Sequence, residues 1–142
     1  MYSRLFVAYG SNLTLCQIQT RCPEAELVGT GIIPNYKMQF REFATIIPCP
    51  GAYTPAVVWK ISHNDEESAR NHAEYPYHKE KLLVKLDDGN IVHAIAFILN
   101  GGYLLPPSTQ YFNALLQAYK DFGLNTDYLF QTLKYSKQSV YR

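Results

Sequence analysis

The clearest structural signal in the sequence is the segment KLLVKLDDGNIVHAIAFIL, residues 81–99. Two runs of branched apolar residues flank Asp88-Gly89, and a glycine at that place supplies the positive φ of a tight hairpin turn. The second run, residues 91–99, is apolar on both faces, which is typical of a central strand. The segment therefore predicts an antiparallel hairpin inside a sheet.

Further strands are predicted on the N-terminal side of this hairpin. Residues 4–9 read as a strand that ends at Gly10, and Ser11 or Asn12 can cap a short helix over residues 13–21. Next come the β-type runs AELVGTGIIP and YKMQFRE, which Pro34-Asn35 separates, and then FATIIP and PAVVWKI as two more strands. Together these runs predict a sheet of five to seven strands.

Helices are predicted after the third group of strands and at the C-terminal end. Ser62 can cap a short polar helix through HNDEESARNHA. Ser108 can cap a longer helix that stops at Gly123, and residues 126–135 form a last one. Strands that come first, with helices between and after them, indicate an α+β class with a mostly antiparallel or mixed sheet. We expect one globular domain over residues 1–142.

Charge and hydropathy narrow the classes of partner. Thirteen basic residues and twelve acidic ones give a formal net charge of +1. This balance favours neither nucleic acid nor an anionic membrane, so we expect neither as a partner. The apolar run near the start is too short for a signal peptide, and no run approaches the about 18 residues of a membrane span. We therefore expect a cytoplasmic location.

Metal and thiol chemistry find little support in the sequence. Cys16, Cys22 and Cys49 form no CxxC pair, so we interpret them as reduced structural thiols. The four histidines show no spacing with cysteines or carboxylates that is typical of a structural metal site. We expect no metal.

Three places can carry chemistry. The stretch VAYGSNL turns from strand to helix, and the backbone N–H groups of such a corner bind carboxylate or phosphate, although a simple capped turn has the same pattern. Glu74 in HAEYPYH follows a thin polar helix, where an apolar pocket would raise the carboxyl pKa, unless the side chain is simply solvated. Ser108 and Tyr111 in PPSTQY are either an N-cap with a core tyrosine or part of a pocket.

Taken in order, these pieces resemble the γ-glutamylcyclotransferase family, also called AIG2-like. LFVAYGSNL is similar to the family's YGSNL signature, AEYP to its E-G-Y-P acid segment, and LPPSTQYFNALLQAYKDFGL to its P-P-S-x-x-Y helix. The resemblance covers nearly the whole chain. It implies a small mixed or antiparallel β-barrel with flanking helices, which binds a small γ-glutamyl substrate and needs no cofactor.

The resemblance also implies roles for particular residues. It places the catalytic acid at Glu74. The substrate-binding set that it implies is Phe6, Val7, Ala8, Tyr9, Gly10, Ser11, Asn12, Tyr77 and Tyr111. The reaction is intramolecular, because the substrate's α-amine attacks its own γ-carbonyl and gives 5-oxoproline and a free amine. A single carboxyl group between the two nitrogens can act first as base and then as acid.

The acid segment departs from the family pattern. Glu74 directly precedes Tyr75-Pro76, whereas a further residue usually stands between the acid and Tyr-Pro. Without a gap, Ala73 takes the acid's place. Three interpretations stay open: Glu74 is the shifted acid of an enzyme, the chain is a binding protein that captures a small metabolite without converting it, or it is a scaffold whose pocket is vestigial. The sequence leaves the released amine and the oligomeric state open.

Overall fold

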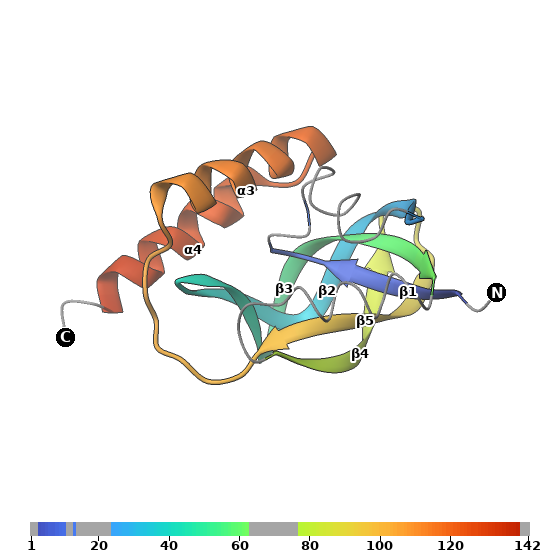
Figure 1. The fold of residues 1–142 in the computed structure, drawn as a ribbon, viewed down its shortest axis with the longest axis horizontal. Coiled ribbons are helices and arrows are strands. Elements are labelled where there is room, and N and C mark those ends of the chain that lie inside the picture. Colours follow the sequence, from blue (N-terminus) through green and yellow to red (C-terminus); the bar gives the residue numbers. More distant parts are fainter. Residues whose placement is uncertain (1–2, 11–12, 14–23, 63–76, 140–142) are drawn as a thin grey trace.

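The structure is a computed structural model, which describes residues 3–10, 13, 24–62 and 77–139. Within these residues the chain forms five strands and two helices (Figure 1). The strands are β1 (Ser3–Ala8), β2 (Glu26–Arg41), β3 (Phe43–Ser62), β4 (Tyr77–Leu86) and β5 (Ile91–Leu99). The helices are α3 (Thr109–Phe122) and α4 (Thr126–Ser139).

The five strands close into a barrel in the order β1-β3-β2-β4-β5. All neighbours are antiparallel except β1 and β5, whose parallel pairing joins Phe6 to Ile95 and closes the barrel. At Gly31, β2 pairs with both β3 and β4, and a Cβ there would collide with the carbonyl oxygen of Lys85. The close approach of β4 to β2 at this position therefore requires glycine. The predicted class, α+β with a small mixed barrel and flanking helices, is confirmed.

The predicted hairpin at Asp88-Gly89 is confirmed. β4 and β5 pair from Tyr77 with Leu99 to Lys85 with Ile91, and Gly89 has a φ of 93° in the turn between them. The alternation of β4, which buries Leu82, Val84 and Leu86, sets the register of this pair against the barrel interior.

The breaks predicted inside β2 and β3 are wrong. Each pair of expected runs forms one long strand, and the two strands pair with each other as far as Arg41 and Phe43. The register shifts between Pro34 and Tyr36, where Asn35 takes a φ of 65° and its side chain accepts a hydrogen bond from Gly51 N–H at 3.0 Å. The proline and glycine signals thus mark an irregularity within a hairpin, since the remaining ladder keeps the strands together.

The two helices cover one side of the barrel and the far part of the β2–β3 hairpin (Figure 1). Ser108 caps α3 by accepting a hydrogen bond from Tyr111 N–H at 3.1 Å, and Gly123 ends it in the left-handed conformation at a φ of 71°. Both predicted boundaries are confirmed. The last helix extends to Ser139, four residues beyond its predicted end. No helix within residues 77–139 or the other described parts is long and apolar enough to span a membrane.

Candidate active site

The candidate site lies where the chain leaves β1. Tyr9 and Gly10 follow the strand directly, and the carbonyl of Gly10 accepts a hydrogen bond from Leu13 N–H at 2.9 Å. This bond links the two described residues on either side of Ser11 and Asn12, which themselves lie outside the described residues.

The Tyr9 side chain points into the protein rather than into solvent. It is 4% exposed, and its hydroxyl donates to the carbonyl of Phe97 on β5 at 2.7 Å. The side chain of Thr45 on β3 lies near this hydroxyl. Burial raises the pKa of Tyr9 well above the ordinary phenol range, so the hydroxyl stays protonated at physiological pH.

Gly10 is enclosed by two elements that are distant in sequence. A Cβ placed on it would lie 3.2 Å from the Cβ of Ala44 and 3.4 Å from the hydroxyl oxygen of Tyr111. That same hydroxyl accepts a hydrogen bond from Ala44 N–H at 3.1 Å, and the Tyr111 ring meets the Phe43 ring edge to face at 5.2 Å. Glycine lets the backbone approach this closely, which is a reason for its place in the turn.

Tyr77 joins the cluster from the start of β4. It pairs with Leu99, and it lies close enough to Tyr9 to contribute to the raised pKa of that phenol, as does Tyr111. Tyr77 on β4 and Tyr111 on α3 therefore both lie near Tyr9, which directly follows β1. We call these three residues the tyrosine cluster.

The remaining predicted residues fall into two groups. Phe6, Val7 and Ala8 are buried in the barrel core, where Phe6 packs against Phe97 with ring centroids 5.5 Å apart. Glu74 lies outside the described residues, as do Ser11 and Asn12. Three peptide units join Glu74 to Tyr77, so their Cα atoms are at most about 11 Å apart. The roles assigned to all of these residues stay predictions.

Sequence reasoning missed the contribution of β3 to this site. Ala44 contacts Gly10 and Thr45 contacts Tyr9, yet the run FATIIP carries only the pattern of a buried strand. The one sequence signal that could have indicated a polar role is the threonine within this apolar run. Its side chain is 1% exposed, and a buried hydroxyl needs a hydrogen-bond partner.

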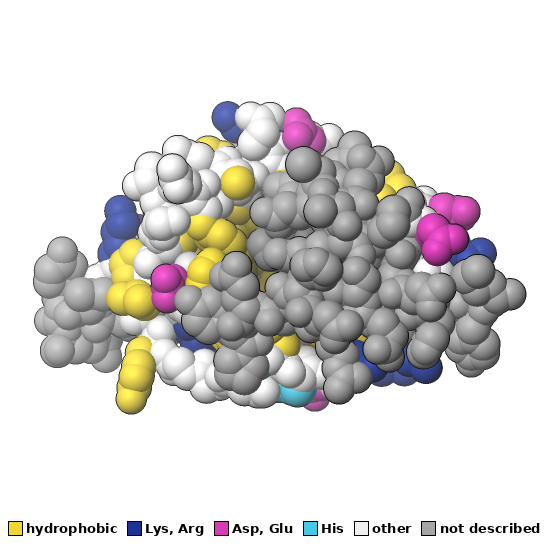
Figure 2. All heavy atoms as spheres, in the orientation of Figure 1, with side chains coloured by type: hydrophobic (Ala, Val, Ile, Leu, Met, Phe, Trp, Pro, Cys, Tyr) yellow, Lys and Arg dark blue, Asp and Glu magenta, His cyan; other side chains and the backbone are white. Residues whose placement is uncertain are grey.

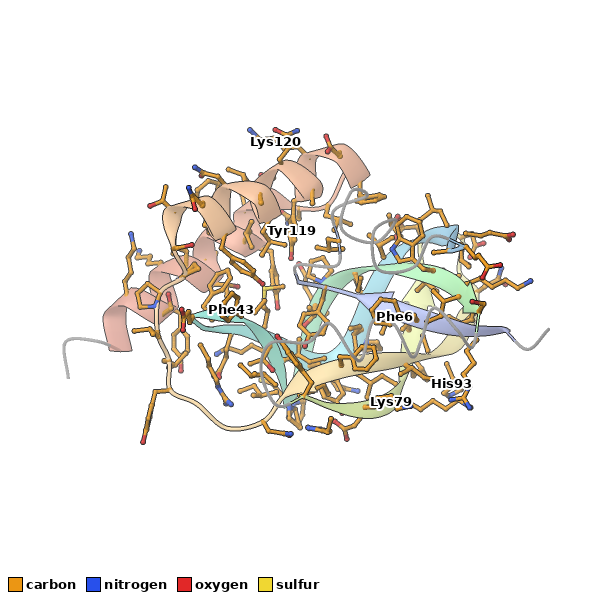
Figure 3. The ribbon with its side chains drawn as sticks, in the orientation of Figure 1. Phe6, Phe43, Lys79, His93, Tyr119 and Lys120 are labelled. Carbon is orange, nitrogen blue, oxygen red and sulfur yellow. The ribbon has the colours of Figure 1, made fainter. Side chains whose placement is uncertain are left out.

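A separate groove of about 510 Å³ lies on the outside of the barrel. It is lined by Arg4, Leu5, Lys79, Glu80, Lys81, His93 and Ile95. Lys79 and His93 lie far from the helices in Figure 3. Arg4 stands near the start of β1, whereas Tyr9 follows its end, so the groove is not part of the tyrosine cluster.

Within the described parts of the chain, neither a charged patch on the visible face nor metal ligands single out another site. Figure 2 shows basic and acidic side chains scattered around the visible face rather than gathered in one patch. Among the residues that the structure describes, no group of three or more histidines, cysteines or carboxylates could hold a metal ion.

Known proteins resemble this chain in both sequence and structure. No protein-family model matches it. The gamma-glutamylcyclotransferase of Mus musculus is 27% identical over 141 residues, which span 87% of this chain and 74% of the mouse protein. The protein of the same name from Homo sapiens is 27% identical over 143 residues, or 89% and 75% of the two chains.

Solved structures agree with these relatives. A gamma-glutamyl cyclotransferase superposes with a TM-score of 0.82 at 25% identity, over 92% of this chain and 86% of that one. An AIG2-like protein from Mus musculus has a TM-score of 0.59 at 11% identity, over 78% and 83%, which supports the fold alone. The chain thus has the γ-glutamylcyclotransferase fold. The family resemblance read from its motifs is confirmed by relatives over most of its length.

Proposed function

We propose that this chain is an enzyme of the γ-glutamylcyclotransferase type, which converts a γ-glutamyl amine or amino acid to 5-oxoproline and a free amine. The observation that carries the proposal is the packing of Gly10 between Ala44 and Tyr111. It brings the YGSNL turn and the PPSTQY helix, about a hundred residues apart, to one place, as the resemblance requires.

The reaction needs no outside reactant. The substrate's α-nitrogen forms a bond to its own γ-carbonyl carbon, and the bond from that carbon to the leaving nitrogen breaks. One proton moves from the attacking nitrogen to the leaving one. Glu74 is the proposed carrier of this proton, and a carboxyl in that role contributes about 10²- to 10⁴-fold to a rate.

The turn after β1 is the proposed binding element. Its N–H groups can hold either the substrate's α-carboxylate or the oxyanion that develops at the γ-carbonyl, and loss of one oxyanion donor costs about 3 kcal/mol in known enzymes. The enclosure of Gly10 supports this role, because donors act best when they are fixed before the reaction.

The test is release of 5-oxoproline from a panel of γ-glutamyl amines and amino acids. We expect turnover by the wild type, and a fall of at least about 100-fold in kcat for Glu74→Gln. Glu80→Gln is the matched control, because Glu80 is an exposed carboxylate that lies in the outer groove. Full activity of Glu74→Gln would show that the acid is misassigned.

The alternative is a non-catalytic protein that binds a small metabolite on the same fold. The specific motivation is the residue missing from AEYP, which puts Ala73 at the acid position. A γ-glutamyl compound that raises the melting temperature of the folded wild type, but is recovered unchanged after prolonged incubation, would favour this alternative over the enzyme.

A further inference from the structure

The groove on the outside of the barrel crosses three neighbouring strands. Ile95 of β5 lies at its centre, because it pairs with Phe6 of β1 on one side and with Lys81 of β4 on the other. Side chains that are paired across strands, or that lie two positions apart along one strand, point to the same face of a sheet. Three basic residues that line the groove lie two positions from these paired residues and share their face: Arg4, Lys79 and His93.

This shared face is the outside of the barrel. On β4 the alternate residues Leu82 and Val84 are buried in the core, whereas Lys81 is exposed. Figure 3 shows Lys79 and His93 on the side of the barrel away from the helices. The groove therefore faces outwards, away from the barrel interior.

The charges that line the groove are mostly positive. Arg4, Lys79 and Lys81 stand against one carboxylate, Glu80. Glu80 Oε2 lies 3.3 Å from His78 Nε2, and His78 is not among the lining residues, so this carboxylate is engaged at the edge of the groove. Arg4 and Lys79 also interact within the protein, so they contribute charge to the groove rather than free side chains.

The groove combines its basic rim with an apolar floor. Ile95 is 9% exposed and Leu5 is half-buried. The volume of about 510 Å³ falls within the range of small-molecule sites, roughly 300–1,000 Å³. A strand spacing of about 4.8 Å places β1 and β4 about 10 Å apart across β5, so long side chains from both strands can reach one compact ligand.

We propose that this groove binds a small organic phosphate, whose phosphate group contacts the basic rim and whose organic part covers Leu5 and Ile95. Such a phosphate carries about two negative charges near neutral pH, and arginine and lysine bind its oxygens through charge-assisted hydrogen bonds. Three cations favour a dianion over a single carboxylate. The overall charge of +1 disfavours nucleic acid, which needs an extended basic surface. This binding site does not depend on the proposed function.

The test is a titration with phenyl phosphate, followed through the backbone amide resonances in nuclear magnetic resonance spectra. We expect saturable shifts at Leu5, Lys81 and Ile95. Inorganic phosphate should shift the same resonances with lower affinity, because it has no apolar part to cover the floor. Raising the ionic strength from about 0.01 M to about 0.15 M should weaken the binding of both, since the rim is exposed.

Charge reversal at Lys81 should give the clearest loss. We expect Lys81→Glu to weaken phenyl phosphate binding by about tenfold and Lys81→Gln by about threefold, as is typical of exposed charge pairs. Glu80→Gln should act in the opposite direction and strengthen binding by about twofold, because it removes the one carboxylate that lines the groove.

Lys85→Glu is the matched control. Lys85 is an exposed lysine on the same face of β4, but it does not line the groove. It lies four residues from Lys81, or about 13 Å, and at about 0.1 M ionic strength a charge at that distance is largely screened. We expect the affinity of this variant to stay within about twofold of wild type.

Three results would overturn the proposal. Shifts that do not saturate would show that the groove is not a site. Equal losses of affinity in Lys81→Glu and Lys85→Glu would show general attraction to a basic surface. Saturable shifts confined to Gly10 and Tyr111 would place the phosphate at the candidate active site. A wild type that releases no 5-oxoproline refutes the proposed function, while the titration still decides whether the groove binds phosphate.

Discussion

Tyr9 and Tyr119 are buried to nearly the same extent, at 4% and 0% exposed, but their hydroxyl groups have opposite environments. The Tyr9 hydroxyl donates a hydrogen bond to the Phe97 carbonyl beside the candidate site. The Tyr119 hydroxyl, on α3 between the helices and the barrel, has no hydrogen-bond partner among the described residues (Figure 3). The hydrogen bond of Tyr9 fixes the position of its side chain against β5, whereas Tyr119 mainly fills space in the core.

A nearby tyrosine shows that the helix layer can also use its hydroxyl groups. Tyr128 on α4 accepts a hydrogen bond from Met38 N–H at 3.0 Å and lies 3.4 Å from the Thr54 hydroxyl. The contrast is therefore between paired and unpaired phenols, and not between the barrel and the helices. Pairing should decide what each hydroxyl contributes to stability, because an unpaired buried group costs free energy while a paired one does not.

Tyr9→Phe should have the largest effect on stability. It leaves the buried Phe97 carbonyl without the Tyr9 donor, so we expect the free energy of unfolding to fall by about 2 kcal/mol. Denaturant titration at neutral pH measures it. Tyr103→Phe, at a side chain 89% exposed, is the control and should change nothing. A loss no greater than that control's would refute the importance of this hydrogen bond.

Alkaline pH should destabilise the folded protein through both buried phenols, Tyr9 and Tyr119, to a similar extent. Burial raises the pKa of Tyr9 and of Tyr119 in the folded protein, whereas an unfolded phenol titrates near pH 10. The contribution of each neutral phenol is thus complete below about pH 10. Above it, stability falls by about 1.4 kcal/mol per pH unit for each tyrosine.

The measurement is the midpoint of denaturant unfolding at several pH values between 9 and 11. Other tyrosines and lysines also titrate in this pH range, so the difference in midpoint between wild type and each variant isolates the contribution of the substituted tyrosine. Tyr9→Phe and Tyr119→Phe should each flatten the fall by a similar amount, since both phenols are buried. A pH profile of either variant that parallels the wild type would contradict the burial of that hydroxyl.

Tyr119→Phe should have the smallest effect at neutral pH. It removes a buried hydroxyl that has no partner among the described residues, so we expect stability to stay within about 1 kcal/mol of wild type or to rise. Tyr128→Phe is the paired counterpart, and it should cost about 1 kcal/mol because Met38 N–H loses its acceptor. Equal losses of stability in the two variants would show that hydrogen-bond pairing does not decide what each buried phenol contributes.

The sequence predicted those elements whose signals are local. Asp88-Gly89 indicates the hairpin, and Ser108 and Gly123 indicate the ends of α3, because turn and cap chemistry involves residues a few positions apart. Local signals also misled, since Pro34-Asn35 predicted a break where the strand continues. Pairing with a long neighbour outweighs a local preference of this kind.

The tyrosine cluster and the hydrogen bonds of Tyr9 and Thr45 to β5 had no local signal. Thr45 lies 54 residues from Leu99 and Tyr9 lies 88 residues from Phe97, so neither partner can be read from spacing. The motifs alone determined the kind of fold and the residues to consider. Only the closed barrel decided which of them meet, because strand pairing brings Tyr9 to Phe97 on β5 and Gly10 to Ala44 on β3, contacts that no local preference specifies.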